Sequence, residues 1–111
     1  MELKIEDLPG RITKAALSGR FDTMGAIAIE LPFNTLANER LTLVVDLSNV
    51  SFMSSYGIRV LLRGAKIAKS KGAKLVIFCP DTTVRKVLNI AGTSDLIPVY
   101  PTLDAATAAV S

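Results

Sequence analysis

The strongest constraint on the fold is a strand–helix–strand pattern in the middle of the chain. Residues 41–47 (LTLVVDL) form a nearly continuous apolar run, and residues 74–79 (KLVIFC) form another. Such runs are typical of strands buried on both faces. Between them lies an amphipathic segment whose apolar residues recur at helical spacing. These residues are Ile58, Leu61, Leu62, Ala65 and Ala68. Since a helical crossover joins parallel strands, the pattern predicts a parallel strand pair.

Weaker patterns extend this unit in both directions. Strands are expected at residues 3–5, 11–17 and 96–99, and helices from residue 22 or 23 to Pro32, from Asp81 to Ala91 and over 102–110. Gly72 and Gly92 are expected to end the two helices that precede them. The order β-β-α-β-α-β-α-β-α predicts an α/β fold. We expect one domain over residues 1–111, with a mainly parallel or mixed sheet covered by about four helices.

Three further expectations concern local structure. In the first helix we expect Met24, Ile27, Ala28 and Leu31 to form the buried face, because their spacing is helical. Pro32 should end or kink that helix, since proline lacks the backbone N–H of a helix interior. We expect residues 48–53 to form a loop between the central strand and the next helix.

The composition excludes several classes of function. The 111 residues include no histidine and one cysteine, Cys79, so catalytic triads, His/Cys zinc sites and an intrachain disulfide are excluded. Asp22 and Asp46 are the carboxylates expected near the central loop, and two acids without a pocket do not make an enzyme site. No glycine-rich nucleotide motif occurs. We therefore expect no enzyme activity, no cofactor and no metal, with Asp46 in a structural role and Cys79 as a small buried apolar residue.

The hydropathy pattern bears on the location of the protein in the cell. Half of the residues are apolar, but the longest apolar runs are short and interrupted. No segment has the length of a transmembrane helix, and the first residues lack the basic and apolar regions of a signal peptide. We therefore expect a cytoplasmic protein that does not insert into membranes.

Positive charge is concentrated in one part of the chain. No acidic residue occurs between Leu47 and Pro80, whereas six basic residues do. These are Arg59, Arg63, Lys66, Lys69, Lys71 and Lys74. Arg59, Arg63 and Lys66 share a helix face. This face is either a solvated surface, a docking surface for an acidic partner, or a site for nucleic acid or anionic membrane. The absence of tryptophan and the few aromatic residues argue against nucleic-acid binding.

Two serines, Ser54 and Ser55, stand directly before the central helix. Serine is a common N-cap residue, because its oxygen accepts a hydrogen bond from a free backbone N–H of the first turn. The same position tolerates a phosphate, since the N-terminus of a helix carries partial positive charge. The two serines are therefore helix caps, a phosphorylation site, or both.

Residues 45–58 (VDLSNVSFMSSYGI) resemble the signature of the STAS domain, as found in bacterial anti-sigma factor antagonists. The family pattern is a strand, a loop, and then Asp-Ser-Ser/Thr-Gly-Leu at the start of a helix. The Gly19-x-x-Asp22 segment, the turn and strand at 72–76 and the helix at 84–92 are also similar to the family. The resemblance covers roughly residues 1–110 and implies the STAS fold.

The resemblance also implies a function and a site. It implies an anti-sigma factor antagonist that captures an anti-sigma factor with serine kinase activity. Phosphorylation of the serine aligned with Ser55 then blocks capture, and a serine phosphatase reverses the modification. The implied partner-binding residues are Asp22, Ser54, Ser55, Tyr56, Gly57, Arg59 and Arg63.

This chain departs from the family pattern at two positions. Ser54 stands where the family has aspartate, and Tyr56 replaces a small residue. Ser54 is thus a second candidate acceptor for a phosphate. Ser54 in place of the aspartate favours an alternative function, a non-phosphorylated STAS subunit of a stress-signalling or transporter-associated complex. The oligomeric state and the identities of the kinase and sigma factor stay open.

Overall fold

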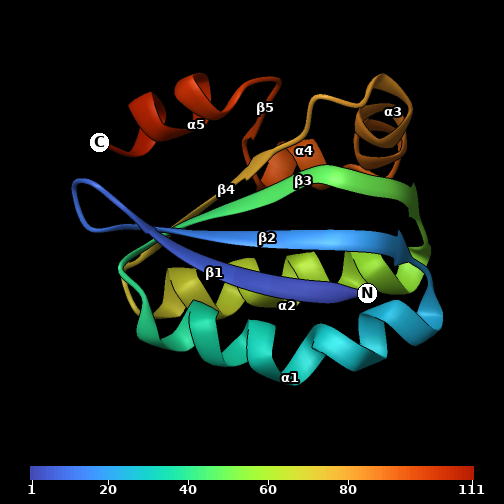
Figure 1. Cartoon of the computed structure of the whole chain (residues 1–111), viewed down its shortest axis with the longest axis horizontal. Coiled ribbons are helices and arrows are strands. Elements are labelled where there is room, and N and C mark those ends of the chain that lie inside the picture. Colours follow the sequence, from blue (N-terminus) through green and yellow to red (C-terminus); the bar gives the residue numbers. More distant parts are fainter.

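The two predicted buried strands lie side by side in a five-stranded sheet, with helices on both of its faces (Figure 1). The computed structural model describes all residues from Met1 to Ser111. Its elements are β1 (Glu2–Leu8), β2 (Ile12–Phe21), α1 (Thr23–Glu39), β3 (Thr42–Met53), α2 (Ser55–Ser70), β4 (Lys74–Phe78), α3 (Thr82–Ile90), α4 (Thr93–Leu96), β5 (Val99–Tyr100) and α5 (Leu103–Val110).

The strand order β1-β2-β3-β4-β5 follows the sequence. β1 and β2 form an antiparallel hairpin, whereas β2, β3, β4 and β5 are parallel to their neighbours. The mixed, mainly parallel α/β sheet predicted from the sequence is therefore confirmed. The parallel arrangement places the carboxyl ends of β2 and β3 at the same end of the sheet, where α1 and α2 begin.

Each face of the sheet packs against its own helices. α1 and α2 lie side by side below the sheet in Figure 1, whereas α5 lies above it. Alternate residues of β3 point to opposite sides. Leu43, Val45 and Leu47 belong to a core of 22 buried residues that also includes residues of α1 and α2. Val44 belongs to a smaller cluster of five buried residues, which includes Ala106 and Val110 of α5. The larger core positions α1 and α2.

The predicted buried face of α1 is wrong. Met24, Ile27 and Leu31 are 76%, 54% and 75% exposed, and Ala28 is exposed as well. The residues that pack on the sheet are instead Gly25, Ala26, Ile29, Phe33, Leu36 and Ala37. The helix also continues through Pro32 to Glu39. Pro32 is exposed, and the buried residues Phe33 and Leu36 beyond it hold the last turns on the sheet.

Two further boundaries differ from the sequence-based expectations. β3 continues through residues 48–53, which were expected to form a loop, and pairs there with residues 18–21 of β2. Register shifts between Ala16 and Ser18 and between Gly19 and Arg20 accommodate this extension. Leu96 ends the short helix α4 rather than starting a strand, and β5 contains only Val99 and Tyr100. The chain therefore has five helices where about four were expected.

Candidate functional site

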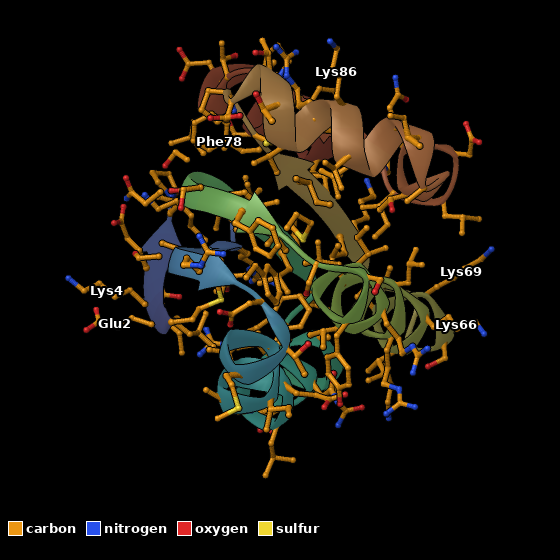
Figure 2. All side chains as sticks on the ribbon, turned by 90° about the vertical axis from the view of Figure 1, so that its right-hand side faces the viewer. Glu2, Lys4, Lys66, Lys69, Phe78 and Lys86 are labelled. Atoms are coloured by element: carbon orange, nitrogen blue, oxygen red, sulfur yellow. The ribbon has the colours of Figure 1, made fainter.

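The N-termini of α1 and α2 meet at one end of the sheet, which faces the viewer in Figure 2. A polar side chain caps each helix. Asp22 Oδ1 accepts a hydrogen bond from the Gly25 N–H at 2.8 Å, and Ser54 Oγ accepts one from the Gly57 N–H at 3.0 Å. The predicted cap role of Asp22 is confirmed. Two positive helix ends therefore face the same region of surface.

Phe21 fixes the position of the α2 N-terminus. Its backbone oxygen accepts a hydrogen bond from the Ser54 N–H at 2.9 Å, and its ring is fully buried. Gly57 lies against this ring, where a Cβ atom would come within 2.8 Å of Phe21 Cδ1. Glycine is required at position 57 because the first turn of α2 packs directly on the end of β2.

The two serines have different environments. Ser54 is half-buried and precedes α2 as its N-cap, with its oxygen engaged by Gly57. Ser55 is the first residue of α2, is exposed, and makes no side-chain hydrogen bond. Of the two hydroxyl groups, that of Ser55 is the one free of a structural role.

A polar network connects α2 to α1 beside these serines. The Tyr56 hydroxyl donates a hydrogen bond to Glu30 Oε1 at 3.0 Å, and Arg63 Nη1 lies 3.6 Å from Glu30 Oε2. The Arg59 guanidinium lies 6.0 Å from the centre of the Tyr56 ring. The hydrogen bond to Glu30 and the negative charge of its carboxylate raise the pKa of Tyr56 above its ordinary value. The network holds Tyr56 against α1 and leaves Ser55 uncovered.

Sequence reasoning missed three residues of this region. Glu30 joins Tyr56 to Arg63, and Arg20 stacks on the Phe52 ring at 4.5 Å while its Nε lies 3.8 Å from Asp22 Oδ2. Phe52 is 40% exposed. Glu30 is the only acid between Asp22 and Glu39, and it faces a helix rich in arginine and lysine. This opposition of charge is a sequence signal that could have identified Glu30. The contact between Arg20 and Phe52 depends on the extension of β3, and no sequence signal predicts it.

The structure thus separates the predicted partner-binding residues into two groups. Asp22, Ser54, Ser55 and Gly57 surround the paired helix N-termini. Tyr56, Arg59 and Arg63 follow α2 away from that end, and Arg63 is turned toward α1 by Glu30. Gly57, which was expected to bind a partner, is instead buried against Phe21, because the first turn of α2 packs on the end of β2.

Two other candidates lie in structural positions. Asp46 is inside β3 rather than at its end, and its Oδ1 accepts a hydrogen bond from the Ser48 N–H at 2.8 Å. Cys79 is fully buried, and this burial raises the pKa of its thiol. Both agree with the structural roles expected for them.

The structure contains no group of three or more acidic, cysteine or histidine side chains placed to hold a metal ion. Likewise, no helix combines the length and the apolar character needed to cross a bilayer.

Comparisons with known proteins place the chain in a family. A family model described as the STAS domain matches residues 8–106. RsfA of Mycobacterium tuberculosis, an anti-sigma-F factor antagonist, is 30% identical over 67 residues, which cover 60% of this chain and 52% of RsfA. The match therefore spans about half the length of RsfA. BtrV of Bordetella bronchiseptica is 32% identical over 111 residues, which cover 98% of this chain and 94% of BtrV.

A solved structure agrees with this assignment. The crystal structure of an anti-sigma factor antagonist from Mycobacterium paratuberculosis superposes with a TM-score of 0.87 and is 28% identical. The superposition covers 98% of this chain and 92% of that protein. The five-stranded mixed sheet, the helix pair on one of its faces and the match over residues 8–106 have one explanation: this chain belongs to the STAS domain family.

Proposed function

We propose that this chain is an anti-sigma factor antagonist, a cytoplasmic binding protein without catalytic activity. In this function it captures an anti-sigma factor and so releases a sigma factor. Its similarity to RsfA and to the antagonist of Mycobacterium paratuberculosis supports the proposal. The surface that we assign to capture surrounds the paired helix N-termini and comprises Asp22, Ser54, Ser55, Tyr56, Arg59 and Arg63, whereas Gly57 lies buried beneath it.

We further propose that phosphorylation of Ser55 by the captured anti-sigma factor, acting as a serine kinase, ends the capture. The supporting observation is that Ser55 is exposed and free at the start of α2, whereas the oxygen of Ser54 caps the helix. In the transfer, Ser55 Oγ forms a bond to the γ-phosphorus of ATP, the bond to ADP breaks, and the hydroxyl proton leaves to a base of the kinase. A serine phosphatase restores the hydroxyl by hydrolysis.

The surroundings of Ser55 favour a stable phosphorylated form. A phosphate there adds about −1.5 to −2 charges next to the positive N-terminus of α2. Arg59 lies one turn further along the same helix, at the i+4 position where ion pairs form. The fold therefore tolerates the modification. The added charge lies instead on the surface that meets the partner, where a misplaced charge costs several kcal/mol.

The test uses the purified protein, its cognate kinase and peptide mass spectrometry. Wild-type protein and Ser54→Ala are expected to gain one phosphate at position 55, and Ser55→Ala none. In a binding assay, Ser55→Ala should retain the anti-sigma factor, whereas Ser55→Glu should bind it at least about tenfold more weakly. Phosphate on Ser54 in the wild-type protein would refute the assignment of Ser55. A protein that binds its partner but never gains a phosphate would instead be the constitutive STAS subunit of a larger complex.

A further inference from the structure

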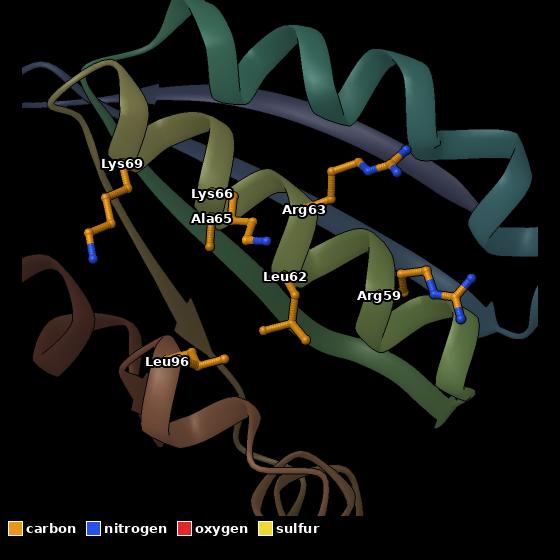
Figure 3. A pocket seen from close by; sticks show the side chains of 7 residues that line it. All are labelled: Arg59, Leu62, Arg63, Ala65, Lys66, Lys69 and Leu96. Carbon is orange, nitrogen blue, oxygen red and sulfur yellow. The ribbon is translucent and has the colours of Figure 1, made fainter.

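A surface groove runs along α2, between this helix and α4 (Figure 3), and shares Arg59 and Arg63 with the surface proposed for capture. Its volume is about 570 Å³. Its lining residues are Arg59, Leu62, Arg63, Ala65, Lys66, Lys69 and Leu96. Leu62 and Leu96 point into the space between the two helices, and Leu96 is 72% exposed. The floor is therefore apolar and open to solvent.

The rim of the groove is positively charged. It carries four basic side chains from α2, and only Arg63 has an acidic neighbour, because it is turned toward Glu30 of α1. Arg59, Lys66 and Lys69 form no ion pair. No acidic residue lines the groove. Three uncompensated positive charges beside exposed leucine make a surface that is complementary to an acidic segment with apolar side chains.

We propose that this groove binds an acidic amphipathic helix of a partner protein. From Arg59 to Lys69 the groove follows about three turns of α2, or about 15 Å at 1.5 Å per residue. An extended segment would find no backbone partner along α2, because the N–H and C=O groups inside this long helix are bonded to one another. A helix satisfies its own backbone, and its apolar stripe fills the floor while its acids meet the rim.

The shape and chemistry of the groove disfavour two other ligands. Proteins bind single-stranded nucleic acid by stacking aromatic side chains on its bases, and the groove contains no aromatic residue. An anionic membrane is bound by an apolar face that inserts into the lipid, whereas Leu62 and Leu96 lie in a hollow between two helices.

The test uses a stapled helical peptide of about 14 residues with leucines on one face and glutamates beside them. Binding is measured by fluorescence anisotropy against the full chain. Leu96→Glu and Lys66→Glu are each expected to weaken binding about tenfold or more. Matched control variants lie outside the groove: Ile90→Glu, which changes an 86% exposed residue of α3, and Lys86→Glu on the same helix should bind within about twofold of wild type.

Several outcomes would overturn the proposal. One is the absence of saturable binding by the wild-type protein, and another is equal loss of binding in the control variants. A third is equal binding of a peptide of the same composition with its leucines scattered around the helix. Tighter binding of single-stranded DNA or of anionic lipid vesicles at physiological salt would assign the surface to those ligands. Since Ser55 lies outside the groove, Ser55→Ala should bind the peptide normally, which separates this proposal from the phosphorylation switch.

Discussion

α1 and α2 lie on the same face of the sheet and contribute to the same core, yet their outward faces differ in chemistry. The outward face of α1 exposes Met24, Ile27 and Leu31, whereas that of α2 exposes arginine and lysine. Only α2 is amphipathic in the usual sense. α1 is apolar on both sides, so hydropathy alone does not predict which side faces the sheet. The predictions below test this difference, beginning with the largest expected effect.

The first prediction concerns which face of α1 stabilises the fold. Ile29 is 3% exposed and Leu31 is 75% exposed, although the two residues are chemically alike and two positions apart. Ile29→Ala is expected to lower the free energy of unfolding by about 2 to 5 kcal/mol, because it leaves a cavity in the core. Leu31→Ala should change it by less than about 0.5 kcal/mol. Urea denaturation of both variants measures the difference.

The two variants control for each other, since both shorten one aliphatic side chain of the same helix. Equal losses of stability would contradict the packing described for α1. A larger loss in Leu31→Ala would mean that the face predicted from the spacing of apolar residues is the buried one.

The second prediction concerns the contact between α1 and α2. Gly64 lies against the ring of Phe33, which is fully buried, and a Cβ atom at position 64 would collide with that ring. Gly64→Ala would stabilise an isolated helix by about 1 kcal/mol. In the folded protein, the collision with the Phe33 ring should outweigh this gain and destabilise the protein by about 1 to 3 kcal/mol. In a Phe33→Ala background the same substitution should become neutral or stabilising, and a double-mutant cycle by urea denaturation tests the sign.

The third prediction separates the two serines. Ser54→Ala removes the hydrogen bond that caps α2 and should cost about 1 kcal/mol. Ser55→Ala removes an exposed hydroxyl without a partner and should change stability by less than about 0.5 kcal/mol. Thermal unfolding of the two variants provides the measurement. If Ser55→Ala were the more destabilising variant, position 55 would hold the cap.

The smallest expected effect concerns the bridge from Tyr56 to α1. Because Glu30 raises the pKa of Tyr56, the folded protein holds the phenol proton more tightly than the unfolded chain. The bond therefore stabilises the fold fully below the ordinary value of 10.0, and this contribution is lost as the pH rises through the raised pKa. In a Tyr100→Phe background, Tyr56 is the only tyrosine, and its ultraviolet titration should have a midpoint above 10.0. Adding Glu30→Gln should lower that midpoint; an unchanged midpoint would exclude the contact.

The central unit of the fold was predictable because its signals agree with one another. The buried runs at 41–47 and 74–79 and the amphipathic segment between them have one solution, a parallel pair with a helical crossover. The orientation of α1 was not predictable from hydropathy, since Met24 and Ile29 belong to two different apolar stripes of the same helix. Pro32 led to a wrong prediction of where α1 ends. The packing of the residues beyond it offsets the loss of one backbone hydrogen bond of the helix.

The site was predictable where residues are adjacent in sequence. Ser54, Ser55 and Gly57 stand together before a helix, so their common location follows from local pattern. Glu30 and Phe52 enter through tertiary structure: Glu30 depends on the packing of α1 beside α2, and Phe52 on the extension of β3. Even within the local motif, the assignment of the cap to Ser54 required the geometry of its hydrogen bond with Gly57.

The anchoring of the α2 N-terminus to Phe21 has a consequence for selectivity. Ser55 is presented in a helical turn that is anchored to β2, so its backbone is already ordered before any partner arrives. An enzyme that modifies this residue must fit the end of a folded helix. One that requires an extended substrate must first unravel the turn, which breaks the Ser54 cap and separates Gly57 from the Phe21 ring. Under the proposed function, the fold would therefore favour a kinase that accepts a helical substrate.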